Sequence, residues 1–157
     1  KKKPLDRVIV EFGASPFSVV LADGPDIKSI NYAVGYEIST RFDLRLHMDV
    51  NTYSYENYNS LVGIDYSSTK YTGVSLGVAY NLLDDMNFIY ENSSLDILTK
   101  FGVELNDHSE QESLFFDIST RLKLKDMPYV GIGYYYKNSD LTMDNIQGIY
   151  FSFGIEF

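Results

Sequence analysis

The 157-residue chain contains no cysteine and no tryptophan, and it has no long hydrophobic run. Without cysteine the chain can form neither a disulfide nor a thiolate metal site. A transmembrane helix needs about 18 or more consecutive apolar residues, and no stretch of this sequence approaches that. These absences exclude disulfide-stapled, thiolate-metal and helical membrane proteins.

Basic residues are also scarce. Lysine and arginine total 13 against 22 aspartates and glutamates, which gives a formal net charge of −9. Nucleic-acid binding is therefore not expected, because phosphate contacts need clustered basic side chains. The one basic run, Lys1 to Lys3, lies in residues 1–6, which we interpret as a flexible N-terminal segment. No apolar signal core follows it, so we expect an exported protein to have lost its signal peptide.

Aromatic residues are abundant, with 14 tyrosines and 10 phenylalanines. Aromatic and β-branched residues favour strands. The length suits a single domain covering residues 1–157. Apolar residues alternate with polar or small residues in eight segments, which predicts eight strands. The expected strands are residues 7–15, 29–40, 42–54, 70–82, 95–106, 113–124, 129–137 and 148–157.

The apolar face of these segments carries no charge, and its only polar members are Thr72, Thr99 and Thr120. Glycine indicates which face points inward. A strand glycine usually marks the close approach of other groups, and the lumen of an eight-stranded barrel is barely wide enough for side chains. Nine of the eleven glycines lie on the polar face, so this face is predicted to line the lumen and the apolar face to meet lipid. These glycines are Gly13, Gly35, Gly73, Gly77, Gly102, Gly131, Gly133, Gly148 and Gly154.

The last segment supplies the most specific pattern. Its outward face is Ile149, Phe151, Phe153, Ile155 and the final Phe157. This strand resembles the terminal strand that the outer-membrane assembly machinery recognises in bacterial β-barrels. With eight antiparallel strands, the whole chain resembles the small outer-membrane barrels of the OmpA transmembrane-domain and OmpX type. The resemblance implies a monomer in the outer membrane of a Gram-negative bacterium, in contact with lipopolysaccharide and other lipids and without a cofactor.

The predicted connections differ in length. Those at 41–43 and 125–128 are short, as periplasmic turns are, whereas those at 55–69, 107–112 and 138–147 are longer and polar, like cell-surface loops. Residues 83–94 are interpreted either as a long turn or as the start of the fifth strand. None of the four prolines is expected at a strand centre, because proline cannot donate a hydrogen bond to the ladder.

Charged residues of both signs fall on the predicted inward face. Isolated charges in a narrow lumen would be costly, so we expect them to pair and to plug the barrel. The functional alternative is a narrow ion path lined by the same groups. The predicted lumen charge network comprises Glu11, Glu37, Arg45, His47, Asp49, Lys100, Glu104, Asp117, Arg121 and Glu156, with Asp43, Asp96, Lys123 and Lys137 on the same face.

Evidence for catalysis is thin. His47 shares the inward face with Arg45 and Asp49 and is expected in the lumen network. Asp107-His108-Ser109-Glu110 holds the ingredients of a catalytic triad, but triads depend on geometry rather than on adjacency. The outer-membrane lipid A deacylases carry a His-x-Ser-Asn element on their penultimate strand. Residues 134–139 of this chain read Tyr-Tyr-Tyr-Lys-Asn-Ser and lack that histidine, so no catalytic residue is predicted.

No metal site is predicted either, because no Asp-x-Asp-x-Asp-Gly loop is present. The acidic loop residues are expected to be solvated, with bridging of divalent ions to lipopolysaccharide as a hypothesis. They are Asp23, Asp26, Asp107, Glu110, Glu112, Asp140 and Asp144. Several tyrosines fall on the lipid face, where they suit the headgroup boundary. Those tyrosines are Tyr32, Tyr36, Tyr80, Tyr134 and Tyr136.

A second tyrosine group surrounds the longest predicted loop and either extends the hairpin or forms an adhesive patch. It consists of Tyr53, Tyr55, Tyr58, Tyr66 and Tyr71. Taken together, the sequence predicts a non-enzymatic outer-membrane barrel with a plugged lumen and a membrane-structural role, or a surface-interaction role through its loops. The alternatives are a lipid A-modifying acylhydrolase and a soluble lipocalin-like barrel that binds an apolar ligand.

Overall fold

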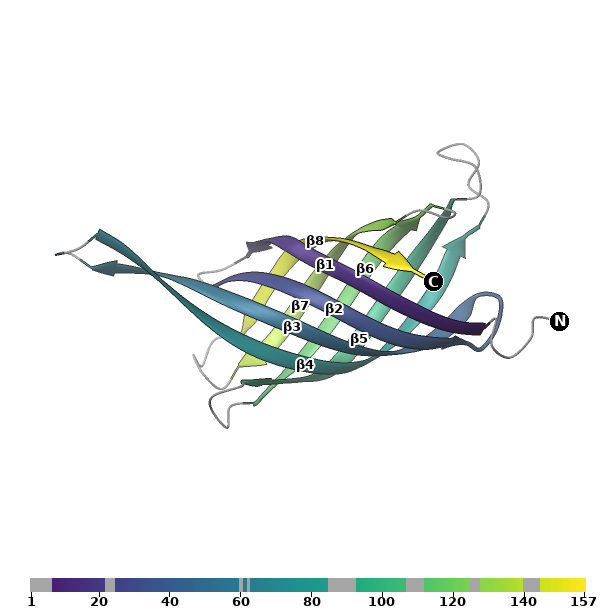
Figure 1. Cartoon of the computed structure of the whole chain (residues 1–157), viewed down its shortest axis with the longest axis horizontal. Coiled ribbons are helices and arrows are strands. Elements are labelled where there is room, and N and C mark those ends of the chain that lie inside the picture. The colour runs from purple at the N-terminus through teal and green to yellow at the C-terminus, as the bar shows by residue number, and fades with distance from the viewer. Residues whose placement is uncertain are drawn as a thin grey trace.

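The computed structural model describes residues 7–21, 25–59, 61, 63–84, 93–106, 112–124, 128–139 and 145–157. These residues form eight antiparallel strands that close into one barrel, with each strand beside its neighbours in sequence and β1 beside β8 (Figure 1). The predicted all-β, eight-stranded up-and-down barrel is confirmed. The strands are β1 (Val8–Val20), β2 (Asp26–Glu37), β3 (Phe42–Asn59), β4 (Gly63–Leu83), β5 (Ser94–Asn106), β6 (Glu112–Lys123), β7 (Tyr129–Ser139) and β8 (Ile146–Glu156).

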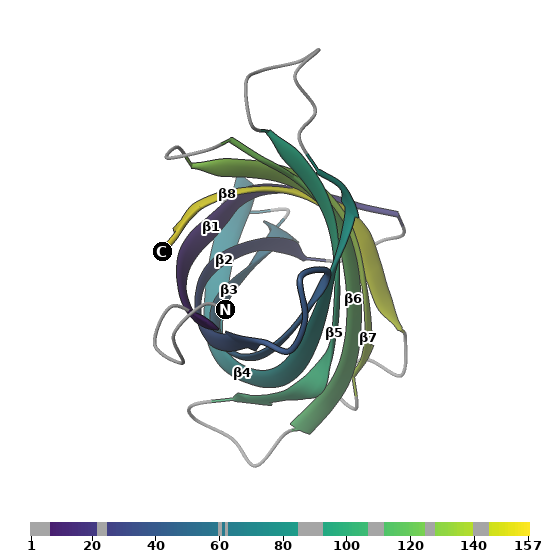
Figure 2. The ribbon, with the colours of Figure 1, turned by 90° about the vertical axis from the view of Figure 1, so that its right-hand side faces the viewer.

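Exposure alternates along every strand. The apolar residues point outward, as Val34 (59% exposed), Leu76 (54%) and Phe153 (51%) illustrate. Most charged residues of the strand centres point inward, and Glu11 is 0% exposed while Arg121 is 5% exposed. The barrel therefore has the orientation that the glycine distribution predicts, with a mainly apolar exterior and a mainly polar interior. Figure 2 shows the closed ring of strands from one end. No helix within the described ranges is long and apolar enough to cross a membrane.

Glycines make room for large lumen side chains on the neighbouring strand. Gly133 of β7 pairs with Tyr150 of β8, and a Cβ on Gly133 would overlap the Tyr150 ring. Gly148 pairs with Tyr135 in the same hairpin, and its Cβ would meet the Tyr135 hydroxyl. Each tyrosine thus lies over a glycine, which lets a ring fit into a lumen that eight strands keep narrow.

The connection predicted at 55–69 is wrong in extent. β3 continues to Asn59 and β4 begins at Gly63, and the two pair without a register shift from Phe42↔Tyr80 to Asn59↔Gly63. β2 stops pairing with β3 at Ser54, and β5 stops pairing with β4 at Tyr71. Residues 55–59 and 63–70, here called the hairpin extension, therefore project beyond the barrel as a two-stranded ribbon (Figure 1).

The expectation that no proline enters a strand centre is also wrong. β1 runs to Val20 rather than ending near residue 15, and Pro16 lies within it. The register of β1 against β8 shifts between Ala14 and Phe17, so Pro16 lies at an irregularity of the ladder. A bulge of this kind tolerates proline because a ladder hydrogen bond is already missing there.

The chain topology gives the barrel two different ends. The turn-side end carries the chain termini and the connections at 38–41, 84–93 and 124–128, whereas the loop-side end carries those at 21–25, 60–62, 107–111 and 140–145. β8 closes the turn-side end against β1, where the amides and carbonyls of Val10 and Phe157 exchange backbone hydrogen bonds of 2.8 and 3.0 Å.

Candidate functional site: the charged lumen

Glu11 is the centre of the lumen network near the turn-side end. Arg121 of β6 donates to both of its carboxylate oxygens at 2.8 Å, and Arg45 of β3 donates to Oε2 at 2.5 Å. Tyr129 and Asn31 donate to Oε1 at 2.8 and 3.0 Å. One fully buried carboxylate therefore joins β1 to three other walls of the barrel and to its neighbour β2. Charge-assisted bonds of this geometry are among the strongest hydrogen bonds in proteins.

Arg45 extends the Glu11 cluster to the barrel mouth. Its side chain also donates to Asp43 at 2.5 and 3.0 Å and to Glu156 at 2.7 Å. Lys123 then bridges Glu156 and Asp96, each at 2.8 Å. Asp43, Glu156 and Lys123 are partly accessible to solvent, with 26% exposure for Lys123, so solvent can complete the charge balance there.

Midway along the lumen, Lys100 of β5 lies between two carboxylates. Its Nζ is 3.3 Å from Asp49 Oδ2 and 4.0 Å from Asp117 Oδ2, and Tyr150 donates to Asp117 Oδ1 at 2.6 Å. Asp49, Lys100 and Asp117, here called the Lys100 cluster, are all buried. Closer to the loop-side end, Lys137 donates to Glu104 and to the Tyr53 hydroxyl, both at 2.8 Å.

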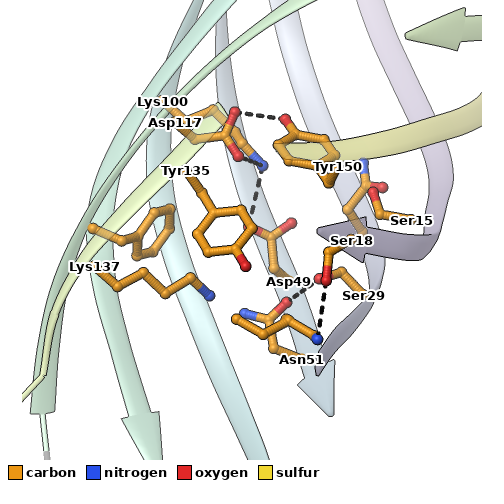
Figure 3. A pocket seen from close by; sticks show the side chains of 13 residues that line it. Ser15, Ser18, Ser29, Asp49, Asn51, Lys100, Asp117, Tyr135, Lys137 and Tyr150 are labelled. Carbon is orange, nitrogen blue, oxygen red and sulfur yellow. Dashed lines mark hydrogen bonds and ion pairs between the residues drawn. The ribbon is translucent and has the colours of Figure 1, made fainter. Parts of the chain in front are cut away.

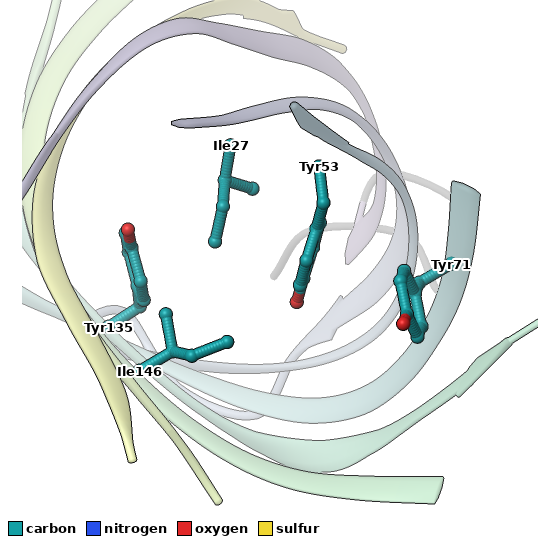
Figure 4. Close-up of a cluster of buried hydrophobic side chains, with 5 residues drawn as sticks. All are labelled: Ile27, Tyr53, Tyr71, Tyr135 and Ile146. Carbon is teal, nitrogen blue, oxygen red and sulfur yellow. The ribbon is translucent and has the colours of Figure 1, made fainter. Parts of the chain in front are cut away.

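An apolar cluster covers the lumen at its loop-side end. Tyr53 and Tyr71 pack with a ring-centroid distance of 4.6 Å. The buried members, shown in Figure 4, are Ile27, Tyr53, Tyr71, Tyr135 and Ile146. Tyr53 and Tyr71 thus point into the barrel interior, so these two members of the predicted tyrosine group form no exposed adhesive patch. Tyr55 packs against the cluster as a partly buried neighbour, and the side chains of Tyr58 and Tyr66 lie outside the described part.

The structure brings most of the predicted charge network together, with two members placed differently. Glu37 is only half-buried, at the end of β2 opposite Asp43. His47 is 0% exposed, but neither of its ring nitrogens has a hydrogen-bond partner within the described structure. A Cβ on Gly77 would meet the His47 ring, so His47 fills space over a glycine as the tyrosines do.

Sequence reasoning missed the tyrosines of the network. Tyr129 and Tyr150 hydrogen-bond the two key carboxylates, and the Arg121 guanidinium lies 4.4 Å from the centre of the Tyr129 ring. Their position on the glycine-bearing face was the available signal, because a polar tip on an apolar ring suits a charged lumen.

Several predicted features lie outside the described residues. These are the 107–110 segment with His108 and Ser109, the 85–92 part of the uncertain connection, and the acidic residues Asp23, Asp140 and Asp144. Of the remaining acidic loop residues, Asp26 accepts a hydrogen bond from Ser18 at 3.1 Å. No group of three or more potential metal-ligating His, Cys, Asp or Glu side chains occurs among the residues that the structure describes.

Within the described barrel, open lumen space is small. A cavity of about 50 Å³ adjoins the Lys100 cluster (Figure 3). This volume holds a few water molecules, since one water needs about 10–15 Å³. Midway along the described lumen, the ion pairs thus leave only a small pocket. At this level there is neither room for an apolar ligand nor a wide path for solutes.

No family model and no curated protein sequence matches this chain.

Proposed function

We propose that the chain is a small transmembrane β-barrel of a bacterial outer membrane, without enzymatic activity, that anchors an interaction surface on its β3–β4 hairpin. The loop-side end faces the cell exterior, and the turn-side end faces the periplasm. The ion-paired lumen holds the walls together rather than conducting solutes.

The observation that carries this proposal is the apolar exterior. Every strand contributes exposed apolar side chains, whereas the charged residues at the level of this apolar surface are buried in the lumen. Soluble monomers rarely expose contiguous apolar surface of this extent. The outward residues of β3 are apolar from Phe42 to Val50, and those of β4 from Val74 to Leu82. Each stretch matches the ~9–11 residues with which a strand crosses a bilayer.

Aromatic side chains border the apolar belt. At its turn-side edge the rings of Phe42 and Tyr80 lie 4.8 Å apart, and Arg41 reaches the Tyr80 hydroxyl at 3.5 Å. Towards the loop side, Tyr134 donates to Gln147 at 2.8 Å. Rings with polar tips favour the headgroup region and form girdles around membrane barrels.

The hairpin extension supports a role in surface interaction. Beyond Val50 the outward positions of β3 are polar, beginning with Thr52 and Ser54, so the hairpin leaves the apolar belt there. The strand continues to Asn59, which at 3.3–3.4 Å per residue gives roughly 30 Å of strand beyond Val50. Neither β2 nor β5 extends alongside residues 55–59 and 63–70, and the edge of such a ribbon is a surface to which a partner polypeptide can add a strand.

The membrane assignment is tested by fractionation and refolding. The protein is expected in the outer-membrane fraction, and the purified chain should be monodisperse only with detergent or lipid. A monodisperse, folded monomer in plain buffer would instead support a soluble barrel.

The hairpin role is tested by shortening the extension. Glu56 and Tyr66 are directly paired, so an Asn-Gly turn can replace residues 57–65 without disturbing Tyr55 in the lumen cluster. Cells carrying this variant should keep normal surface amounts of the barrel but lose adhesion or serum survival. Unchanged adhesion and survival at equal surface amounts would remove the hairpin from the proposal.

The lipid A alternative has a separate test. Replacing both His108 and Ser109 by alanine is expected to leave the lipid A profile unchanged. Loss of a deacylated lipid A species in that variant would restore the enzymatic hypothesis.

A further inference from the structure

Lys100 makes the longest ion pairs of the lumen. Its Nζ lies 3.3 Å from Asp49 and 4.0 Å from Asp117. The other ion pairs that the structure describes in the lumen measure 2.5–2.8 Å. One ammonium group thus serves two carboxylates, with a long hydrogen bond to Asp49 and a longer contact to Asp117. Counted by itself, the Lys100 cluster carries one negative charge in excess. Arg121, whose charge also acts on Asp117, is bonded to both oxygens of Glu11.

This negative charge is buried. Asp49, Lys100 and Asp117 are 5%, 8% and 7% exposed. The next cation towards the loop side, Lys137, is paired with Glu104, so it has no charge to spare for the Lys100 cluster. Solvent does not reach these groups as it reaches Lys123 at the barrel mouth. A buried charge without a counter-charge is strongly unfavourable, so the cluster requires one further positive charge.

The adjoining cavity provides a place for that charge. Asp49 Oδ1 is buried and has no hydrogen-bond partner in the described structure, and Asp49 lines the cavity of about 50 Å³. Figure 3 shows the carboxylates of Asp49 and Asp117 reaching Lys100, with Ser29 and Asn51 nearby on the same cavity. Together with Ser29 and Asn51, the oxygen-bearing side chains of the lining include Ser15, Ser18 and Asn31. Carboxylate, amide and hydroxyl oxygens are the ligands that hard cations prefer.

We propose that this cavity binds one small monovalent cation, of the size of sodium or potassium, held by Asp49 Oδ1 with hydroxyl and amide oxygens of the cavity wall. A single charge neutralises the cluster, whereas a divalent ion would leave an excess positive charge beside the Lys100 ammonium. Water alone would satisfy the hydrogen bonds but not the charge. The site lies inside the barrel and does not depend on the hairpin or on the surface role.

The test compares salts in the refolded protein. Thermal unfolding is followed by circular dichroism in detergent micelles in NaCl, KCl and N-methyl-D-glucamine chloride at equal ionic strength. N-methyl-D-glucamine is too large for a cavity of about 50 Å³. The unfolding midpoint should rise by a few degrees in sodium or potassium and should saturate with concentration, as binding to the folded state alone requires.

Three variants locate the effect. Asp49→Asn removes the free carboxylate oxygen, and Asp117→Asn removes the excess charge while leaving Asp49 in place; both should weaken the apparent cation affinity at least tenfold. Glu156→Gln, in the solvent-reached cluster, should keep the wild-type response. Equal midpoints in all three salts, as a bound proton would produce, overturn the proposal. So does a cation response that survives in Asp49→Asn.

A direct measurement decides the matter should Asp49→Asn fail to fold. Sodium-23 resonances are broadened by exchange with a protein-bound site. The wild-type barrel is expected to broaden the sodium line, and excess potassium but not N-methyl-D-glucamine should sharpen it again. An unbroadened line, or broadening that N-methyl-D-glucamine removes equally well, contradicts the site.

Discussion

Glu11 on β1 and Arg121 on β6 form a two-bonded ion pair across the lumen, with both nitrogen–oxygen distances at 2.8 Å. The two residues are far apart in sequence and their strands are not neighbours in the sheet. The pair therefore ties together walls that the backbone ladder does not connect directly. Because Arg45 shares the same carboxylate, the loss of Glu11 leaves two buried guanidinium groups with fewer acceptors.

Glu11→Gln is the first prediction. Removing one partner of a buried ion pair typically costs about 3–5 kcal/mol, and we expect a loss of that size in the free energy of unfolding. Urea unfolding in lipid vesicles provides the measurement. Glu156→Gln is the matched control, since the Glu156 side chain is 17% exposed and should cost less. Equal losses in the two variants would show that burial does not set the importance of these pairs.

Glycine substitutions test the packing of the lumen. Gly133→Ala is expected to destabilise the barrel by about 1–3 kcal/mol, because the added methyl group overlaps the Tyr150 ring. Gly73→Ala is the control, as its Cβ would meet Phe115 at an ordinary distance of 3.4 Å. A barrel that tolerates both changes equally would mean that the tyrosine can move away.

A charge on the outer face tests the contact with lipid. Leu76→Arg should lower the free energy of unfolding in vesicles by about 2–4 kcal/mol, because an arginine near the bilayer midplane is poorly solvated. Ser68→Arg, exposed on the hairpin extension, should have little effect. If Leu76→Arg were as neutral as Ser68→Arg, the outer face would be in water.

Conductance tests the plugged lumen. In planar bilayers the wild-type barrel should show no stable steps of porin size, because the cavity beside the Lys100 cluster, midway along the described lumen, measures only about 50 Å³. Eight strands leave an interior that side chains fill. Stable, large steps would favour the alternative of an ion path lined by the same charges.

The fold could be predicted from the sequence because alternation and glycine placement are local signals. Residues such as Val34 and Leu76 mark the outer face without knowledge of any partner strand. The partners of the charges could not be predicted in this way. The acidic residue that pairs with Arg121 depends on the tilt of the strands and on how the barrel closes. A single sequence does not show which residues face each other across the lumen.

The β3–β4 hairpin and the end of β1 were predicted only in part, for different reasons. The tyrosine group left an extended hairpin as one interpretation, but residues 55–59 and 63–70 are mostly polar, so they resemble a loop in composition although their backbones pair fully. The first strand was expected to end at residue 15, but a shift in register carries β1 past Pro16 to Val20. Strands that pair without burying apolar side chains cannot be predicted from hydrophobic periodicity.

The central claim is that the outer face of the barrel contacts lipid, and the depth of a label on that face tests this claim most directly. The chain has no cysteine, so single cysteines at Leu76 and Ser68 can each carry one fluorescent label in vesicles. We predict that quenchers attached to lipid chains quench the label at Leu76 and that water-soluble quenchers act on the label at Ser68. A label at Leu76 that only water-soluble quenchers reach would contradict the membrane-spanning barrel.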